Sequence, residues 1–302
     1  MKIKIASAQY AIKQYSKFKD WQTNIENWVK TAAEQNAEIL LFPEFASLEL
    51  VNLLSPEVQK KPALFADFLQ CLLPEFKITF DELATKFKVT IIAPSFPVKV
   101  ENAFYNRVYV FGVNGLAGYQ DKLFMTNLDS KTIGISSPPK KIAIFKTPKC
   151  TFGIQICYDS EFSIGANCLA QNGAEILLIP SCTETIRGSN RVHISARARA
   201  LEQQFYTVVS QVVGDAAWNT ALHKNYGYAA FYAAPDTEFQ ENGILEIGEP
   251  QEVNWLIHEV DTDLLKTTRS NGQVNTFNDH KNLNYTFNSD EIKIEINTVS
   301  ST

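Results

Sequence analysis

The sequence predicts an α/β protein built from two related halves, and two observations carry this prediction. Apolar, strand-like runs alternate along the chain with amphipathic, helix-like runs. The segment AEILLFPEF, residues 37–45, has a near copy in AEILLIPSC, residues 174–182. Both copies are apolar without alternation, which is typical of strands that are covered on both faces. We therefore expect a pseudo-symmetric structure with helices on one side of these strands and a second sheet on the other.

The first half is expected to begin with an alternating strand and an amphipathic helix. The helix is indicated by apolar side chains at helical spacing, from Trp21 to Ala32. The pair Asn114-Gly115 between two apolar runs is a hairpin signal. The pattern predicts strands at residues 3–10, 38–42, 89–94 and 107–113, and helices at residues 19–35, 62–73 and 80–87.

The second half shows the same alternation. Its first helix should end at Asn172-Gly173, which is a suitable C-terminal cap. The pattern predicts strands at residues 142–145, 152–157, 175–179, 206–213, 228–233 and 255–260, and helices at residues 162–171 and 191–204. We expect one domain over residues 1–280. The tail, 281–302, contains the alternating run DEIKIEINTV, which suits an edge strand, an oligomerisation arm or a solvated terminus.

Composition excludes several classes of function. Of 302 residues, 45% are hydrophobic and 20% are charged, and the net charge is −5. Lys and Arg are scattered, so a nucleic-acid-binding surface is not expected. A secretory signal and a membrane span are not expected either, and this predicts a cytoplasmic protein. Five cysteines without CxxC spacing and four unclustered histidines argue against a disulfide framework or a metal site.

Three segments place reactive side chains at strand ends or beyond a hairpin: Glu44 in LLFPEF, Lys122 in GYQDKLF and Cys157 in FGIQICYDSEF. Taken singly, each also has an ordinary interpretation, as a loop acid, a surface lysine and a core thiol. Together they supply a base, a cation and a nucleophile. That combination is what acyl transfer from an amide or nitrile requires.

The order Glu, Lys, Cys in the settings FPE, DK and CYD resembles the nitrilase, or carbon–nitrogen hydrolase, superfamily. The resemblance runs from KIASAQY to about HEVDTDLL, and ICYDSEF is its most specific block. The segments QDKL, IGIS and CTETIRG are most similar to a branch that is often fused to an acetyltransferase. We expect no such second domain in a chain of this length.

The resemblance implies a four-layer α-β-β-α sandwich with internal pseudo-two-fold symmetry, and homodimers or higher homo-oligomers. It implies a small-molecule amide substrate and requires no metal or organic cofactor. The roles it implies are a general base (Glu44), a cation that stabilises the tetrahedral intermediate (Lys122), a thioacyl-forming nucleophile (Cys157), a backbone oxyanion donor (Tyr158) and a structural ion pair near the site (Arg199 and Glu202).

The chain departs from the family pattern at one important position. Many members have a second glutamate between the lysine and the cysteine, but no glutamate occurs between Lys122 and Cys157. The related branch would place it at Thr132. Asp129 is the only acid in this interval and is a possible replacement. Pocket residues are expected after the catalytic strands and in the TETIRG loop: Phe45, Cys182, Thr183 and Arg187.

The main hypothesis is a cysteine-dependent amidohydrolase for a small linear amide, either a carbamoyl compound or an ω-amide, with nitriles less favoured. A second hypothesis is a papain-like hydrolase in which His193 serves Cys157. A third is a binding or regulatory protein that kept the fold and lost turnover. The missing glutamate motivates this last alternative.

Overall fold

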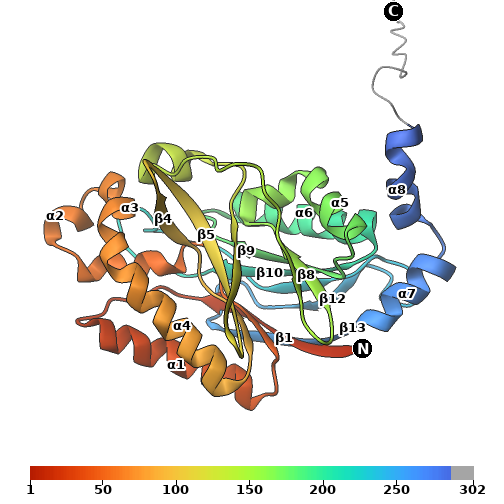
Figure 1. Cartoon of the computed structure of the whole chain (residues 1–302), viewed down its shortest axis with the longest axis horizontal. Coiled ribbons are helices and arrows are strands. Elements are labelled where there is room, and N and C mark those ends of the chain that lie inside the picture. Colours follow the sequence, from red (N-terminus) through yellow and green to blue (C-terminus); the bar gives the residue numbers. More distant parts are fainter. Residues whose placement is uncertain (287–302) are drawn as a thin grey trace, which may run out of the picture.

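The computed structural model describes residues 1–286, which form a mixed α/β fold around a curled, thirteen-stranded sheet (Figure 1). Along the sheet the strands follow the order β4-β5-β3-β2-β1-β10-β9-β8-β7, with β6 on β5, β13 on β1, and β11 between β10 and β12. The strands are β1 (Lys2–Tyr10), β2 (Ile39–Leu41), β3 (Thr90–Ile92), β4 (Phe96–Val100), β5 (Ala103–Gly112), β6 (Gly115–Asp121), β7 (Ile144–Lys146), β8 (Thr151–Ile154), β9 (Ile176–Ser181), β10 (Tyr206–Val212), β11 (Ala230–Tyr232), β12 (Ile244–Ile247) and β13 (Asn254–Asp261).

The helices cover the sheet from two sides. They are α1 (Phe18–Glu34), α2 (Pro56–Gln59), α3 (Phe65–Phe68), α4 (Leu73–Phe87), α5 (Ser163–Gln171), α6 (Ile186–Gln203), α7 (Thr262–Asn271) and α8 (Thr276–Thr286), with short helical segments η1 (Ala46–Leu53), η2 (Pro62–Leu64), η3 (Leu69–Leu72), η4 (Leu128–Ile133) and η5 (Cys157–Glu161). None of the helices within residues 1–286 combines the length and the hydropathy that a membrane span needs.

Two equivalent units make up the centre of the sheet. In the first, β1, β2 and β3 are parallel neighbours with β2 in the middle; in the second, β8, β9 and β10 are parallel neighbours with β9 in the middle. The repeated AEILL segment supplies the middle strand of each unit. This arrangement agrees with the predicted internal symmetry.

The hydrophobic core lies in two clusters separated by the first unit of the sheet. Along β2, Leu40 belongs to the cluster under α1 and α4, whereas Ile39 and Leu41 belong to the cluster shared with α5 and α6. Figure 1 shows helices α1 and α4 on one side of the sheet and helices α5 and α6 on the other. The predicted α/β class and its sandwich layering are confirmed.

Several elements differ from the sequence prediction. The expected helix at 62–73 is divided into η2, α3 and η3, while α4 begins at Leu73 and contains the whole of the expected helix 80–87. Strands β4 and β12 and helices α7 and α8 were not predicted, whereas β6 is the second strand of the hairpin that Asn114-Gly115 indicated. Pro97 obscures β4, yet the strand is tolerated because it pairs on one side only, with β5. Helix α8 crosses the expected domain boundary at residue 280, and DEIKIEINTV lies outside the described residues.

Candidate active site

Glu44, Lys122 and Cys157 come together at the carboxyl ends of three strands. Glu44 lies three residues beyond β2, Lys122 directly follows β6, and Cys157 begins η5 after β8. The Nζ of Lys122 is 2.8 Å from Oε1 of Glu44. The Cys157 thiol hydrogen-bonds with the backbone O of Cys182 at 3.8 Å, and the N–H of Cys182 donates to Oε2 of Glu44 at 3.0 Å. All three side chains are buried. The structure therefore brings together the carboxylate, the ammonium and the thiol that the sequence singled out.

The backbone is bent sharply beside both the acid and the thiol. Phe45 and Cys157 adopt left-handed conformations, with φ of 55° and 50°. Residues other than glycine adopt this region at an energetic cost, and such conformations are enriched at active sites and ligand-binding turns. The Phe45 N–H donates to Oγ of Ser95 at 2.8 Å, which holds the turn that presents Glu44.

Asp129 is the second acid of this cluster. Its Oδ2 lies 2.6 Å from the Nζ of Lys122 and also accepts from the N–H and the hydroxyl of Thr126, at 2.8 and 2.6 Å. Asp129 lies in the single π-helical turn η4 and is completely buried. The family's missing glutamate was expected at Thr132, but the acid that reaches Lys122 is Asp129.

Asn106 connects the two acids and was not predicted from the sequence. Its Nδ2 donates to Oε1 of Glu44 at 2.9 Å and to Oδ1 of Asp129 at 3.4 Å. Its backbone O accepts from the Lys122 N–H at 2.9 Å. The sequence feature that could have pointed to Asn106 is its amide side chain in β5, the strand that pairs with β6 just before Lys122. The side chain is fully buried, so its amide links the two carboxylates inside the protein.

Burial and neighbouring charges shift the pKa values of Glu44, Lys122 and Cys157, each for different reasons. Burial raises the pKa of Glu44; Lys122 opposes this shift and Asp129 adds to it. Burial alone would lower the pKa of Lys122, but the charges of Glu44 and Asp129 raise it above its ordinary value. Burial and the negative charge of Glu44 raise the pKa of the Cys157 thiol. Lys122 is therefore the permanent cation, and Glu44 is the group whose proton affinity is tuned upward.

Asp159 ties the lysine segment to the nucleophile turn. Its carboxylate accepts from the backbone N–H groups of Leu123 and Phe124 at 3.0 and 2.8 Å. Burial raises the pKa of Asp159 to about 7, against the lowering effect of these hydrogen bonds. Residues 123–124 immediately follow Lys122, and Asp159 lies two residues after Cys157. One carboxylate thus fixes the two loops relative to each other.

A cavity of about 330 Å³ opens onto the cluster. Cys157, Tyr158, Cys182 and Thr183 line it, together with charged residues from three further segments. The Cys182 N–H donates to Oε2 of Glu44 at 3.0 Å, so the end of β9 contacts the base directly. Tyr158 is in the first turn of η5, where backbone N–H groups have no partner within the helix. The cavity gives a substrate access to the thiol.

The remaining predicted residues lie elsewhere. The Phe45 ring is buried beneath Lys122, with 5.9 Å between its centroid and Nζ. Arg187 is exposed on the first turn of α6 and does not line the cavity. Arg199 and Glu202 form the expected ion pair at 2.9 Å on α6, but neither lines the cavity.

His193 is engaged away from Cys157. Its Nδ1 hydrogen-bonds with the Tyr232 hydroxyl at 2.8 Å and its Nε2 with Oε1 of Gln211 at 3.1 Å. The imidazole stacks on Tyr228 with 3.7 Å between ring centroids. Burial lowers the pKa of His193 to about 4. Both ring nitrogens of His193 are thus engaged by Tyr232 and Gln211, so the Cys–His arrangement of the second hypothesis is not formed.

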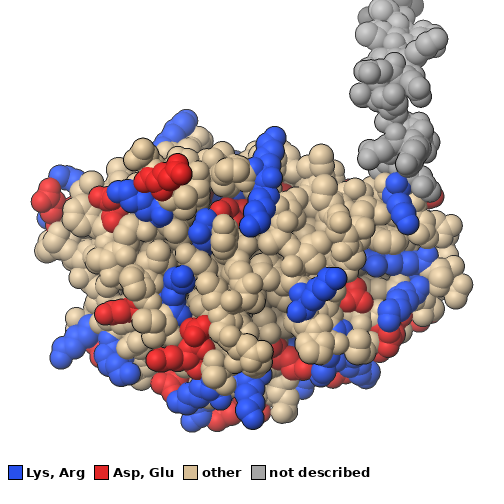
Figure 2. All heavy atoms as spheres, in the orientation of Figure 1, with Lys and Arg blue, Asp and Glu red and all other residues tan. Residues whose placement is uncertain are grey.

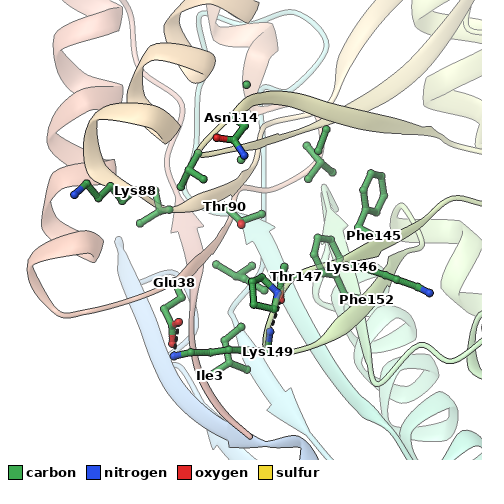
Figure 3. A pocket seen from close by; sticks show the side chains of 18 of the residues that line it. Ile3, Glu38, Lys88, Thr90, Asn114, Phe145, Lys146, Thr147, Lys149 and Phe152 are labelled. Carbon is green, nitrogen blue, oxygen red and sulfur yellow. Dashed lines mark hydrogen bonds and ion pairs between the residues drawn. The ribbon is translucent and has the colours of Figure 1, made fainter.

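A larger hollow, of about 670 Å³, lies at the opposite ends of these strands and contains none of the predicted residues. In Figure 3 the Lys149 ammonium meets the Glu38 carboxylate on one side of the hollow, and Phe145 and Phe152 lie toward the other side; the ion pair measures 2.6 Å. On the face shown in Figure 2, acidic and basic side chains are interspersed. Within residues 1–286, no group of three or more His, Cys, Asp or Glu side chains is arranged to hold a metal ion.

Comparisons with known proteins give a matching family and several similar proteins. Residues 4–266 match the carbon-nitrogen hydrolase family. The chain is 32% identical over 279 residues to the probable hydrolase YhcX of Bacillus subtilis, covering 92% of the chain and 54% of YhcX, and thus spans about half the length of this relative. It is 28% identical over 200 residues to the omega-amidase NIT2 of Homo sapiens, covering 63% of the chain and 67% of NIT2.

One solved structure of similar fold is a mutant amidase from Nesterenkonia sp. AN1. Its active-site cysteine carries the covalently added acetamide moiety of fluoroacetamide. The TM-score is 0.69 at 15% sequence identity, and the likeness covers 89% of the present chain and 94% of the amidase. The likeness in fold therefore extends over most of the chain.

Proposed function

The chain belongs to the carbon-nitrogen hydrolase family, and from this premise we propose that it hydrolyses the carbon–nitrogen bond of a small amide through a thioester at Cys157. The observation that carries the proposal is the buried contact between a thiol, a carboxylate of raised pKa and a lysine ammonium, at the base of a cavity. These are the base, the nucleophile and the oxyanion stabiliser of acyl transfer.

In the first half-reaction Glu44 takes the proton of Cys157, and the sulfur attacks the amide carbon. The negative charge that develops on the carbonyl oxygen is stabilised by the Lys122 ammonium and the Tyr158 N–H. The carbon–nitrogen bond then breaks, and the leaving ammonia takes the proton held by Glu44. The product of this step is a thioester between the acyl group and Cys157.

In the second half-reaction Glu44 takes a proton from water, which attacks the thioester carbon. The carbon–sulfur bond breaks, the acid leaves, and the sulfur regains the proton from Glu44. A base whose pKa is raised by burial suits both steps because it takes up a proton more readily than an ordinary carboxylate does.

Asp129 has a separate role in this mechanism. Each of its partners among the described residues is a donor: the ammonium of Lys122, the N–H and hydroxyl of Thr126, and the amide of Asn106. By accepting from the ammonium, Asp129 raises the pKa of Lys122 and helps to keep it charged and positioned. This supports turnover rather than the inactive binding protein of the third hypothesis.

The cavity wall favours a substrate that carries a carboxylate away from its amide. The Lys224 ammonium lines the cavity and has no ion-pair partner among the described residues, whereas Arg191 is paired with Glu161 at 3.2 Å. A free ammonium at the wall can bind a carboxylate at the distal end of an ω-amide. Omega-amidases among the relatives are consistent with this choice.

The test measures ammonia release from a panel of short unsubstituted amides, ω-amides of dicarboxylic acids and N-carbamoyl amino acids. We expect turnover of at least one ω-amide, its loss in Cys157→Ala, and an acyl adduct on Cys157 by intact-protein mass spectrometry. Lys224→Ala should raise KM for ω-amides more than for uncharged amides. Turnover that survives Cys157→Ala would contradict the mechanism, and no turnover on any of the three classes would favour the binding protein.

We also propose that two copies associate through α5 and α6. Four large apolar side chains on these helices are strongly exposed: Ile164, Ile186, Ile194 and Leu201. Grouped exposed apolar side chains are typical of a protein interface. Light scattering should show a dimer that Ile194→Glu converts to monomer, while Ile78→Glu, at an exposed position on α4, leaves the dimer intact. A monomeric parent chain would contradict this proposal.

A further inference from the structure

Cys182, whose thiol has no part in the proposed hydrolysis, lies in the same cavity as the nucleophile. The Sγ of Cys157 is 3.8 Å from the backbone O of Cys182, to which its thiol hydrogen-bonds. The Cys182 thiol is partly exposed to the cavity and lies 3.6 Å from Oδ1 of Asn225. Two thiols therefore share one cavity of about 330 Å³.

The two cysteines follow the carboxyl ends of neighbouring strands. Strands β8 and β9 are parallel neighbours with Ile154 opposite Leu178, and Cys157 lies in the turn that follows β8. From this turn its sulfur comes within 3.8 Å of the main-chain O of Cys182. Because disulfides join residues whose Cα atoms are about 4.4–6.8 Å apart, a sulfur this close to the backbone of the second cysteine makes Cys182 the thiol with which Cys157 can pair.

We propose that Cys157 and Cys182 form a redox-modification site, at which a hydroperoxide converts the two thiols to a disulfide. Cys157 first gives its proton to Glu44, and its sulfur attacks the peroxide. A sulfur–oxygen bond forms and the oxygen–oxygen bond breaks. The leaving oxygen takes the proton from Glu44 and departs as water or alcohol, which leaves a sulfenic acid on Cys157.

The Cys182 thiol then attacks the sulfenic sulfur. The sulfur–sulfur bond forms, the sulfur–oxygen bond breaks, and water leaves with the thiol proton. Over both steps the two sulfurs lose two electrons and the peroxide gains them. The disulfide blocks hydrolysis because the nucleophile is occupied, but it also prevents further oxidation of Cys157 to sulfinic and sulfonic acids, which thiols do not reverse.

The inference rests on the nucleophilic Cys157 of the proposed function, but it does not need an amide substrate. The other three cysteines lie apart from this cavity: Cys71 and Cys168 are exposed, and Cys150 is buried. A full-length chain with Cys71→Ser and Cys168→Ser therefore removes the exposed thiols and leaves the pair intact.

This parent protein would be treated with hydrogen peroxide and with tert-butyl hydroperoxide, digested without reduction, and analysed by mass spectrometry. We expect a peptide pair joined through Cys157 and Cys182, and hydrolysis that dithiothreitol restores. In Cys182→Ser we expect sulfinic or sulfonic Cys157, no joined peptide, and no recovery with dithiothreitol. The control Cys150→Ser should form the disulfide as the parent does.

Sulfinic Cys157 beside a free Cys182 in the parent overturns the inference. Unmodified Cys157 after peroxide treatment also overturns it. So does an equal recovery of hydrolysis by dithiothreitol in the parent and in the Cys182→Ser variant. A joined peptide in a protein that releases ammonia from none of the tested amides supports this inference and contradicts the proposed hydrolysis. The two ideas can therefore fail separately.

Discussion

The two AEILL segments begin in the same way and end differently. Glu38 N and Glu175 N each donate to the preceding strand at 2.8 Å, and their carbonyls accept from Thr90 N and Tyr206 N. Each glutamate side chain also accepts from a backbone N–H of that preceding strand. After the shared proline, however, the first copy turns at Phe45 and presents Glu44, whereas the second continues as strand through Ser181.

The difference shows how one scaffold supports two tasks. Ser181 stays in the sheet because β9 pairs with β10 as far as Gln211, whereas β2 leaves the sheet after Leu41. The continued strand carries Cys182 to the place where its N–H meets the Glu44 carboxylate. The first copy supplies the acid, and the second copy supplies a backbone donor that holds it.

The largest effect on activity is expected when Glu44 is compared with Ser181, the residues that directly follow the proline in each copy. Glu44→Gln should lower kcat/KM for the best amide by about 1,000-fold, since a positioned general base contributes roughly 10²–10⁴. Ser181→Ala removes a hydroxyl that bonds only to the carbonyl of Ile179 among the described residues, so activity should change little. Steady-state ammonia release measures both variants. Equal losses would mean that the two strand ends are not functionally distinct.

A second experiment compares the ion pairs at the two ends of β2. Lys122→Ala leaves Glu44 and Asp129 buried without their cation, so the free energy of unfolding should fall by about 3–5 kcal/mol. Lys149→Ala breaks the half-exposed pair with Glu38, which should cost less than about 1 kcal/mol. Urea denaturation measures both values. A small effect at Lys122 would show that the cluster is not held as a charged unit.

A third experiment addresses the pH dependence that Asp129 imposes on Glu44. The raised pKa of Glu44 means that activity is lost as pH falls through a value above the ordinary carboxyl range. Because the charge of Asp129 contributes to this rise, Asp129→Asn should move the acidic limb of the profile to lower pH and also reduce kcat. Asp129→Glu keeps the charge and should keep the limb in place. If the acidic limb of the Asp129→Asn profile did not move, the charge of Asp129 would not be influencing the pKa of Glu44.

The smallest effect, on stability, is expected at Glu38 and Glu175, which occupy the same position near the beginning of the two AEILL copies. Glu38→Ala and Glu175→Ala each remove an acceptor for one backbone N–H, so each should lower stability by about 0.5–1.5 kcal/mol without loss of activity. Thermal unfolding monitored by circular dichroism provides the comparison. A much larger loss in one variant would break the structural equivalence.

The sequence predicted those parts of the molecule that local pattern determines. The strand ends at Glu44 and Cys157 and the hairpin before Lys122 could be read from apolar runs and turn residues. The contacts of Asp129 and Asn106 could not, because they depend on a π-helical turn and on the register of β5 beside β6. Asp129 could be named from the sequence as a possible replacement for the missing glutamate, but its contact with Lys122 could not. Arg187 shows the reverse error, since a loop arginine near a predicted site proved to point outward.

The hydrogen bond from Cys182 to Glu44 comes from the main chain, and this has an evolutionary consequence. Any residue except proline at position 182 can supply the same N–H, so the side chain there is free to vary while the base stays in place. Position 182 also lines the cavity. Substrate preference and redox chemistry can therefore drift at this position within a lineage without rebuilding the catalytic centre.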